Sequence, residues 1–435
     1  MGISVVRFFK QCLHSTDRSS DEYLAGKCLR ENSSYRLDVS SETDRMLGFR
    51  EMKRVWTRWK SPKRGLIPMD KETSVAVLSS NEANQDIIIY YIERSASKKI
   101  GVWISKDDLC GDPEFSFFEF SLFWFTALGW SLGIFIKSSS RANRALLIRE
   151  IYENAILVNE IQARGLKHIY HFVPYEKDAN VFSLLMKKLQ VKCTFIPSAG
   201  PISKHNHTMI ADEIVLVTPY QMEEYERKWK DQIRFEKLLR WIPERAFTYI
   251  DLYRNRTFQF HEKTIGYYSH GSWVRLKHKH HSAELAAKKE EWILSLLKLY
   301  VESHPDVNLI IFPHPRERKT ELLEETKAYY SKHVGVDRVA ISSNEKSSAE
   351  SFDQVELAVA AYSSIVYERL FCGFKMIIGS QERTGFPMEN SSLSQIVFYN
   401  YSEMEHFVDD AFGMPNDAFF KQYGIDSFHY SNYSF

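Results

Sequence analysis

From Ser74 onward, short apolar segments alternate with amphipathic helical segments, and this alternation restricts the fold more than any other feature of the chain. It is typical of βαβ units, in which helices connect parallel strands and cover the sheet. In the first half of the chain we expect strands at 74–80, 99–105, 167–173, 192–198 and 212–219. The intervening segments predict helices at 83–98, 142–165, 180–190 and 220–230.

The same pattern starts again near Lys263. The second set of expected strands lies at 263–273 (running into a Gly-Ser loop), 307–313, 337–343, 355–364 and 375–380. Helices are expected at 283–305, 319–335 and 402–412. The chain therefore predicts an α/β protein of two doubly wound, Rossmann-type domains that face a central cleft, where sheets of this kind bind ligands.

Length and composition agree with two domains. The chain has 435 residues, of which 44% are hydrophobic, enough for two cores. Residues 1–70 are polar and weakly periodic, so we expect an N-terminal extension of short helices. Residues 71–255 then form an N-terminal acceptor domain and residues 256–435 a C-terminal domain that binds the nucleotide sugar.

Charge and cysteine content exclude several classes of protein. The formal net charge of +1 gives no overall attraction to nucleic acid. The basic run 275–281 is interpreted as a solvated loop. The cysteines are scattered without the spacing of a metal site, which predicts reduced thiols, no bound metal and a cytoplasmic protein without a secretory signal. They are Cys12, Cys28, Cys110, Cys193 and Cys372.

One apolar segment, FSLFWFTALGWSLGIFI at 120–136, carries no charged side chain. Its length is at the lower limit for a membrane span, and its serines, glycines and tryptophans reduce its hydrophobicity. Three interpretations are open: a buried helix, a surface helix that enters the bilayer interface, and a span. We expect peripheral membrane contact at most.

A histidine follows the apolar strand 307–313 directly, in the sequence LIIFPHPRERK. Pro313 and Pro315 restrict the backbone on both sides of His314, so its imidazole should be held rigidly. An imidazole at a strand end can donate to a phosphate or protonate a leaving oxygen, and Arg316 adds further donors. A solvent-facing turn with an incidental His and Arg is the alternative.

Two other predicted strand ends carry small polar residues. The strand at 355–364 passes directly into the helix IVYERLF, so that Ser363 or Ser364 would cap a helix N-terminus, which is an anion-binding arrangement. The segment YSHGSW, at 268–273, places Gly271 and Ser272 at another strand end. Simple capping and turn formation explain each feature alone, but together they would face one phosphate.

These motifs resemble those of the bacterial sialyltransferases and related nonulosonic-acid transferases of the GT-B fold, which carry a His-Pro motif and a later Ser-Ser or Ser-Thr motif. Here the motifs are His314-Pro315 and Ser363-Ser364, and the resemblance covers residues 263–400. It implies that His314 contacts the phosphate of CMP and assists its departure, and that the paired hydroxyls hold the same phosphate. It also implies an acidic contact to the ribose, for which Glu345 is selected and Glu350 is the alternative.

The acidic general-base motif of that family has no clear copy in the first domain. The best substitute is FVPYEKDAN at 172–180, where Glu176 would act as the base and Asp178 is the neighbouring candidate. Helix capping by Asp178 and a solvated Glu176 remain the structural alternative. Glycine-rich phosphate loops and a metal-binding DxD are missing from the sequence, which fits a metal-independent transferase that needs no cofactor.

The sequence therefore predicts an inverting glycosyltransferase that moves a sialic, pseudaminic or legionaminic type of sugar from a CMP-sugar donor. The expected acceptor is a surface glycan or lipid-linked glycan of capsule or lipopolysaccharide synthesis, reached at the inner face of the cytoplasmic membrane. Two alternatives stay open. One is a CDP-glycerol-type phosphotransferase or a transferase for another nucleotide sugar. The other is a non-catalytic, membrane-associated assembly protein with a GT-B fold.

Overall fold

The chain forms two compact units, each built around a parallel β-sheet. Unit 1 comprises Met1–Val217 and Glu224–Trp241, and unit 2 comprises Thr218–Glu223 and Ile242–Phe435. The computed structural model describes residues 2–31, 41–60, 74–78, 89–90, 92–94, 98–104, 121–129, 141–172, 178–196, 208–216, 225, 227, 230–239, 244–254, 260, 262–277, 283–335, 339–342, 348–383 and 391–432.

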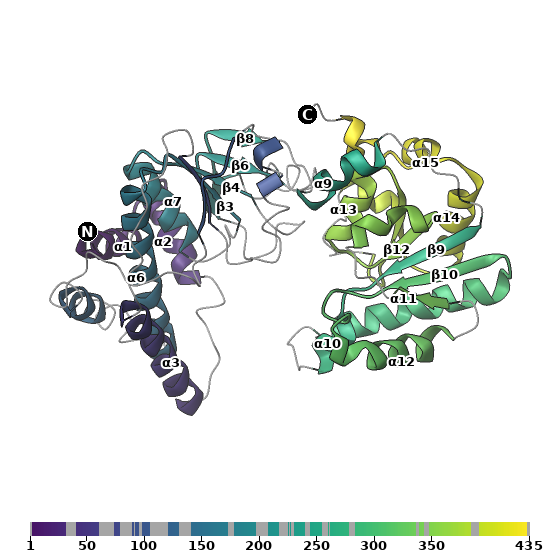
Figure 1. Ribbon diagram of the computed structural model, residues 1–435, viewed down its shortest axis with the longest axis horizontal. Coiled ribbons are helices and arrows are strands. Elements are labelled where there is room, and N and C mark those ends of the chain that lie inside the picture. The colour runs from purple at the N-terminus through teal and green to yellow at the C-terminus, as the bar shows by residue number, and fades with distance from the viewer. Residues whose placement is uncertain are drawn as a thin grey trace. The chain divides into compact units, whose positions relative to one another are not determined.

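The sheet of unit 1 has the strand order β2-β1-β3-β4-β6-β8, and all its strand pairs are parallel (Figure 1). The strands are β1 (Val75–Leu78), β2 (Val102–Ile104), β3 (His168–His171), β4 (Lys192–Phe195), β6 (Glu213–Val215) and β8 (Lys237–Leu239). The strands predicted for this half are confirmed, with shorter bounds. The strand pattern did not predict β8 or the small parallel pair of β5 (Met209–Ile210) with β7 (Ile233–Arg234).

Helices cover this sheet and include those predicted in the first 70 residues. They are α1 (Gly2–His14), α2 (Asp21–Glu31), α3 (Ser41–Lys60), α6 (Arg141–Ala163) and α7 (Ala179–Lys188). Helix α3 packs along α6, and α1 packs against α2 and α6. Helix α6 is followed by Gly165, the predicted C-terminal glycine, which has a φ of +65°. The Leu166 N–H donates to the Ile161 carbonyl at 3.1 Å, which closes the helix with a Schellman motif.

Part of the predicted apolar segment is helical. Residues 121–129 form a helix in which Phe123 and Ala127 are fully buried while Phe125 is 70% exposed. In the part of the chain that the structure describes, no helix is long and apolar enough to cross a bilayer. The remainder of 120–136, like most of the predicted helices at 83–98 and 220–230, lies outside the described residues.

The sheet of unit 2 has the order β11-β10-β9-β12-β13-β14, again with parallel pairing throughout (Figure 1). Its strands are β9 (Lys263–Tyr268), β10 (Val307–Phe312), β11 (Val339–Ile341), β12 (Leu357–Ala360), β13 (Lys375–Gly379) and β14 (Val397–Phe398). The chain leaves β9 toward β10 and β11, and then returns to the other side of β9 to form β12. This is the strand order of a dinucleotide-binding fold, whose ligands bind outside the carboxyl ends of the strands at the switch point.

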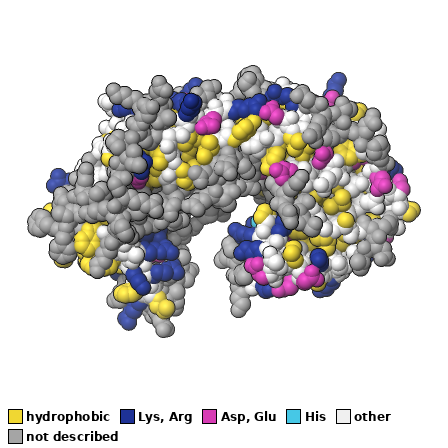
Figure 2. Space-filling model, viewed as in Figure 1, with side chains coloured by type: hydrophobic (Ala, Val, Ile, Leu, Met, Phe, Trp, Pro, Cys, Tyr) yellow, Lys and Arg dark blue, Asp and Glu magenta, His cyan; other side chains and the backbone are white. Residues whose placement is uncertain are grey.

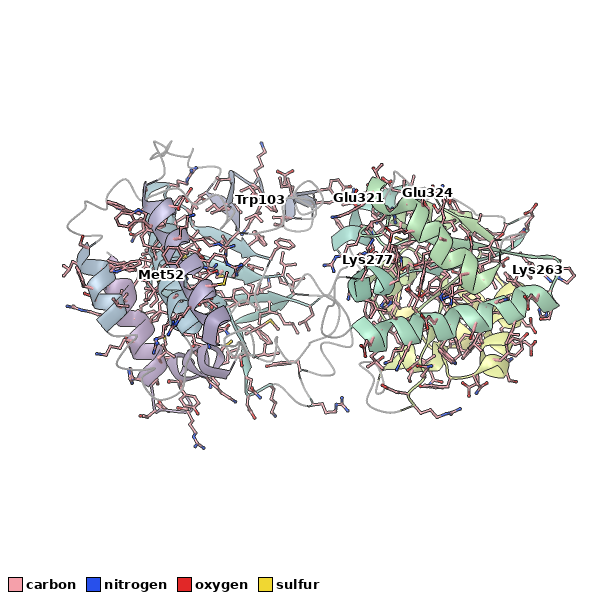
Figure 3. All side chains as sticks on the ribbon, turned by 90° about the horizontal axis from the view of Figure 1, so that it is seen from below. Met52, Trp103, Lys263, Lys277, Glu321 and Glu324 are labelled. Atoms are coloured by element: carbon pink, nitrogen blue, oxygen red, sulfur yellow. The ribbon has the colours of Figure 1, made fainter. Side chains whose placement is uncertain are left out.

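The helices of unit 2 are α9 (Glu244–Tyr253), α10 (Ser272–Lys277), α11 (Ala283–Ser303), α12 (Leu323–Val334), α13 (Ser364–Phe371), α14 (Tyr401–Gly413) and α15 (Asn416–Gln422). Helix α11 packs against α12 and β10, and α13 packs against β13. Figure 3 shows Lys263, at the start of β9, and Lys277, at the end of α10, at opposite ends of the unit. The α10 end is therefore the carboxyl edge of the sheet.

One buried arginine connects several backbone segments of unit 2 by hydrogen bonds. Arg369 is fully buried in α13, and its guanidinium donates to the carbonyls of Lys375 at 3.0 Å, Phe352 at 2.8 Å and Val355 at 2.7 Å. A planar group with donors on every side can satisfy several carbonyls that would otherwise be buried without partners. On the surface, basic and acidic side chains are interspersed on the face shown in Figure 2, in keeping with the formal net charge of +1.

Candidate functional site

The predicted histidine lies in a tight turn at the carboxyl end of β10. The backbone N–H of His314 donates to Oε2 of Glu317 at 2.7 Å, and the N–H of Glu317 donates back to the His314 carbonyl at 2.7 Å. Nε of Arg318 donates to the Pro313 carbonyl, also at 2.7 Å. These bonds fix the backbone of the turn that carries His314. Pro315 and Arg316 are exposed on the outside of the turn.

The surroundings of His314 determine which of its nitrogens carries the proton. The backbone N–H of Arg316 donates to Nδ1 at 3.2 Å, so Nδ1 acts as an acceptor. Burial, and then the positive charges of Arg275 and Arg316, lower the pKa of His314 to about 4. The imidazole is therefore neutral at pH 7 with its proton on Nε2, and Nε2–H is the group free to donate to an anion.

Gly271 brings the turn after β9 against His314. Its φ of +68° lies in the left-handed region, and a Cβ atom there would be 3.0 Å from Cγ of His314 and 3.1 Å from Nδ1. Only a residue without a side chain allows this approach without moving the ring. Two residues selected from the sequence, Gly271 and His314, are thus brought into contact.

The turn after β9 carries further polar groups, of which only Ser272 was predicted. Ser272 begins α10 and is fully buried, and its hydroxyl has no hydrogen-bond partner in the part of the chain that the structure describes. The same is true of Nε2 of His270 and Nε of Arg275. Burial lowers the pKa of His270, and a hydrogen bond with the backbone of Ala361 opposes this effect. Because Ala361 follows β12, His270 connects the turns after β9 and β12.

Ser363 and Ser364 lie at the carboxyl end of β12, where they were predicted. Ser363 occupies the N-cap position of α13 with an extended backbone, but its hydroxyl makes no capping hydrogen bond, and Ser364 is exposed. Ser363 is therefore the N-cap residue, as predicted, although its side chain does not accept a hydrogen bond from the helix. Strands β10 and β12 lie on either side of β9, so they are about 10 Å apart at the usual strand spacing. An anion above the β9 turn would lie between His314 and Ser363.

The acidic residues predicted for the site are not part of the described group around His314. Glu176 and Glu345 lie outside the described residues. Asp178 precedes α7 without capping it, and its buried carboxylate accepts from Nδ2 of Asn154 at 2.6 Å. Glu350 belongs to the 3₁₀ segment Ser348–Gln354 and is partly buried. Within the described ranges, no group of His, Cys, Asp and Glu side chains is arranged to hold a metal ion.

The residues missed by the sequence analysis surround the predicted ones. His270, Arg275 and Arg318 all contribute to the low pKa of His314, so they place positive or ionisable groups around it. Burial, and then the positive charge of Arg316, lower the pKa of Arg275. Several cationic side chains therefore lie close together around His314. A strand end followed by S-H-G-S-W-V-R was the available signal, because it put a titratable side chain on either side of Gly271 and Ser272.

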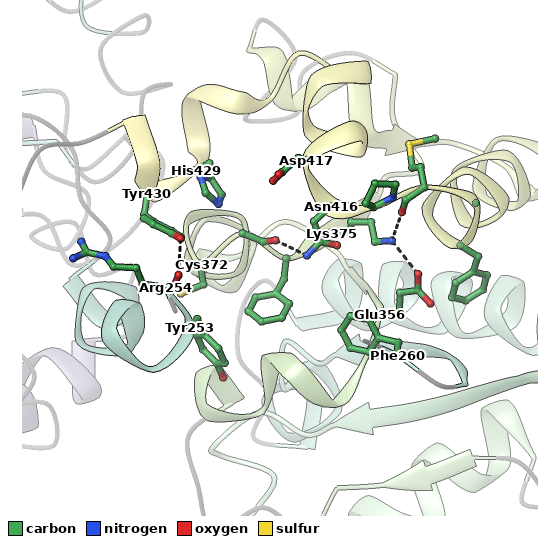
Figure 4. A pocket seen from close by; sticks show the side chains of 16 residues that line it. Tyr253, Arg254, Phe260, Glu356, Cys372, Lys375, Asn416, Asp417, His429 and Tyr430 are labelled. Carbon is green, nitrogen blue, oxygen red and sulfur yellow. Dashed lines mark hydrogen bonds and ion pairs between the residues drawn. The ribbon is translucent and has the colours of Figure 1, made fainter. Parts of the chain in front are cut away.

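A cavity of about 610 Å³ lies at the opposite, amino-end edge of the same sheet (Figure 4). Lys375 at its wall is almost fully buried and donates to Oε1 of Glu356 at 3.0 Å and to the Met414 carbonyl at 2.8 Å. It also donates to the carbonyl of Ala411. The charge of Lys375 is thus satisfied by the protein itself, and we interpret it as a residue that joins β13 to the end of α14.

No family model matches the sequence, and no curated protein matches it. Among solved structures, UDP-GlcNAc 2-epimerase from Neisseria meningitidis, bound to UDP-GlcNAc, matches 82% of this chain and 96% of its own, with a TM-score of 0.50 and 10% identity. The likeness confirms the predicted fold. The chain has a GT-B-like fold.

Two further matches are more distant. MurG from Acinetobacter baumannii covers 80% of this chain and 89% of its own, at a TM-score of 0.39 and 10% identity. The wall teichoic acid polymerase TagF covers 88% of this chain and 93% of its own, at 0.39 and 13%. At these identities the matches concern the course of the chain and not its chemistry.

Proposed function

We propose that unit 2 binds the phosphate of a nucleotide-activated sugar at the carboxyl ends of β9, β10 and β12. The observation that carries this proposal is the contact of Gly271 with the neutral imidazole of His314, in a region of positive potential. The contact fixes the imidazole at the carboxyl ends of β9 and β10, next to the strand pair β9 and β12 at which the strand order reverses. Preorganised donors of this kind stabilise charge that develops on a leaving group.

The reaction we propose is transfer of a nonulosonic acid from a CMP-sugar to a glycan acceptor, with inversion and without a metal ion. The acceptor hydroxyl loses its proton to a general base, for which Glu176 is the candidate, and attacks the anomeric carbon. The bond to the CMP phosphate breaks, and negative charge grows on that phosphate. His314, Arg316 and the hydroxyls of Ser363 and Ser364 then bind the leaving group more tightly than they bind the donor.

We also propose that the protein acts in the cytoplasm, in peripheral contact with the inner face of the cytoplasmic membrane. Support comes from the helix at 121–129, where Leu122 is 42% exposed and Phe125, one turn on, is 70% exposed. An exposed apolar pair on one helix face suits an interfacial position. Sedimentation with anionic vesicles tests it: wild type should sediment, and Phe125→Ser should sediment less. Equal sedimentation of the two would remove this proposal.

Calorimetric titration of CMP, CDP, UDP and GDP into the wild type and His314→Ala tests the donor. We expect CMP to bind selectively and at least tenfold more weakly to the variant, as the loss of one hydrogen bond to a charged group implies. Selective UDP or GDP binding would retain a nucleotide site but change the donor, and CDP would favour the CDP-glycerol alternative. A folded protein that binds none of the four would contradict the proposal.

Turnover separates an enzyme from an assembly protein. A panel of CMP-activated nonulosonic acids, with released CMP as the readout, should identify at least one donor that is consumed. CMP binding without turnover of any nucleotide sugar, with glycan acceptors supplied, would instead favour the non-catalytic alternative.

A further inference from the structure

A buried carboxylate lies directly beneath the turn after β9. Glu290, in α11, is 1% exposed, and its Oε2 accepts from the backbone N–H of His270 at 3.2 Å. The same oxygen accepts from Ser269 Oγ and from Tyr267 OH, both at 3.1 Å. Ser269 Oγ in turn accepts from the N–H of Gly271 at 2.9 Å. Glu290 therefore fixes the backbone that presents Gly271 to the site.

A second buried carboxylate performs the same task for the turn after β10. Glu317 is fully buried, and its Oε2 accepts from the N–H of His314 at 2.7 Å and from Tyr330 OH at 3.1 Å. The two turns that these carboxylates hold meet at the contact between Gly271 and His314. The position of the imidazole thus depends on both glutamates.

The positive charges of Arg275 and Arg318 act on this pair without forming an ion pair with it. No Lys, Arg or His in the described part of the chain forms an ion pair with Glu290 or Glu317. Burial, and then the charge of Glu317, raise the pKa of Glu290 to about 8, and burial raises the pKa of Glu317 to about 7. Each carboxyl of the pair therefore holds its proton to a higher pH than an exposed glutamate does. The groups that face it are Tyr267, Ser269 and His270 from the β9 end, Arg275 from α10, Tyr329 and Tyr330 from α12, and His314 and Arg318 from the β10 turn.

We propose that Glu290 and Glu317 are positioning residues that hold the two turns in the phosphate-binding conformation and take up a proton when phosphate binds. The inference rests on the proposed phosphate site. An anion placed above the turns raises the proton affinity of carboxylates beneath them, and binding must then draw a proton from solution. By the same linkage, phosphate binds more weakly once the pH is high enough to remove that proton.

Calorimetric titration of CMP at pH 8, in buffers of different ionisation enthalpy, measures this uptake. The phosphate of CMP is already dianionic there, because a phosphate monoester has its second pKa near 6. A proton taken up at pH 8 therefore belongs to the protein. Because burial raises the pKa of both carboxyls, part of the pair still gains a proton when CMP binds at pH 8, and we expect a measurable uptake of a fraction of one proton. Zero uptake by the wild type would overturn the proposal.

Substitutions assign the proton to the pair. Glu290→Gln and Glu317→Gln keep the size and the acceptor oxygen of each side chain but remove the titration. Both should reduce the uptake, and both should flatten the loss of CMP affinity between pH 7 and pH 9, which we expect to be several-fold in the wild type. Glu291→Gln is the matched control, because Glu291 neighbours Glu290 on the exposed side of α11, with 46% of its side chain accessible. It should leave both quantities unchanged.

The possible outcomes separate this inference from the proposed function. If no nucleotide binds to the wild type, the phosphate site itself fails. If CMP binds but both Gln variants, folded by thermal unfolding, retain the full uptake and pH dependence, only the role of the pair fails. Equal weakening at pH 7 and pH 9 would assign the glutamates a purely structural role and would also overturn the proposal.

Discussion

Substitution of Gly271 by alanine should weaken phosphate binding while leaving the protein folded. Alanine at a φ of +68° costs about 1 kcal/mol, because its Cβ crowds the following carbonyl in the left-handed region. The added methyl would also lie 3.0 to 3.2 Å from the Cγ, Nδ1 and Cβ atoms of His314, closer than the usual contact distance of about 3.5 Å. The imidazole must therefore move by about half an ångström.

The displacement has a cost because His314 cannot rotate freely. Its backbone is bonded to Glu317 and its Nδ1 to the N–H of Arg316, so moving the ring breaks or bends one of these bonds. A displaced donor can lose no more than a deleted one, so Gly271→Ala should weaken CMP binding several-fold, and less than His314→Ala does. Isothermal calorimetry of CMP measures the change.

Gly424 provides a matched control in the same unit. It has a φ of +62°, and a Cβ there would meet nothing within 4 Å. Gly424→Ala should therefore lose about the same 1 kcal/mol of stability in urea unfolding and bind CMP as the wild type does. If Gly271→Ala also binds CMP normally, or if both variants weaken binding equally, the contact between Gly271 and His314 does not orient the imidazole and the reasoning is refuted.

Three other predictions follow from the described contacts. The pKa of His314 is lowered in the folded state, so the unfolded chain binds more protons between about pH 4 and 6.5, and stability should fall on acidification from pH 7 to pH 5. The thermal unfolding midpoint of His314→Asn should fall less over the same pH range. An equal fall in the two proteins would contradict the lowered pKa of His314. Arg369→Leu leaves the buried carbonyls of Lys375, Phe352 and Val355 without donors and should lower the free energy of unfolding, measured in urea, by about 3 kcal/mol or more. A loss below about 1 kcal/mol would show that these bonds contribute little to stability. Lys375→Met removes the donor to Glu356 and Met414 and should lower the free energy of unfolding by about 2 kcal/mol. The affinity for CMP should not change. Weaker CMP binding would instead place the nucleotide in the cavity of Figure 4.

Much of the fold could be predicted because it rests on periodicity. Alternation of apolar strands with helices gave both parallel sheets, and the carboxyl ends of neighbouring parallel strands must meet at one edge. That rule, together with the flanking Pro313 and Pro315, predicted that His314 and Gly271 lie at the same edge of the sheet. The short strands β5, β7 and β8 were missed because segments of two or three residues are too short to show a period of two.

The supporting residues of the site were harder to find because their roles depend on helical phase and on turns. Glu290 is followed at once by Glu291, and only the first lies on the stripe of Ala287, Ile293, Leu294 and Leu297 that α11 buries. An acidic residue on an apolar stripe was a readable signal. Glu317 gave no such signal, because its contact with the His314 N–H arises only when the turn closes. Pairing between turns, as for His270 and Ala361, cannot be read from one segment.

The central claim, that the Nε2–H of His314 donates to a phosphate, can be measured directly. Nuclear magnetic resonance of protein labelled with ¹⁵N-histidine, assigned with His314→Asn, reports the protonation of each ring nitrogen. At pH 7 the free protein should show Nδ1 unprotonated and Nε2 protonated, and saturation with CMP should shift the Nε2 resonance while the other assignments hold. If CMP saturates the protein and the Nε2 resonance of His314 does not move, the histidine does not contact the phosphate and the account is contradicted.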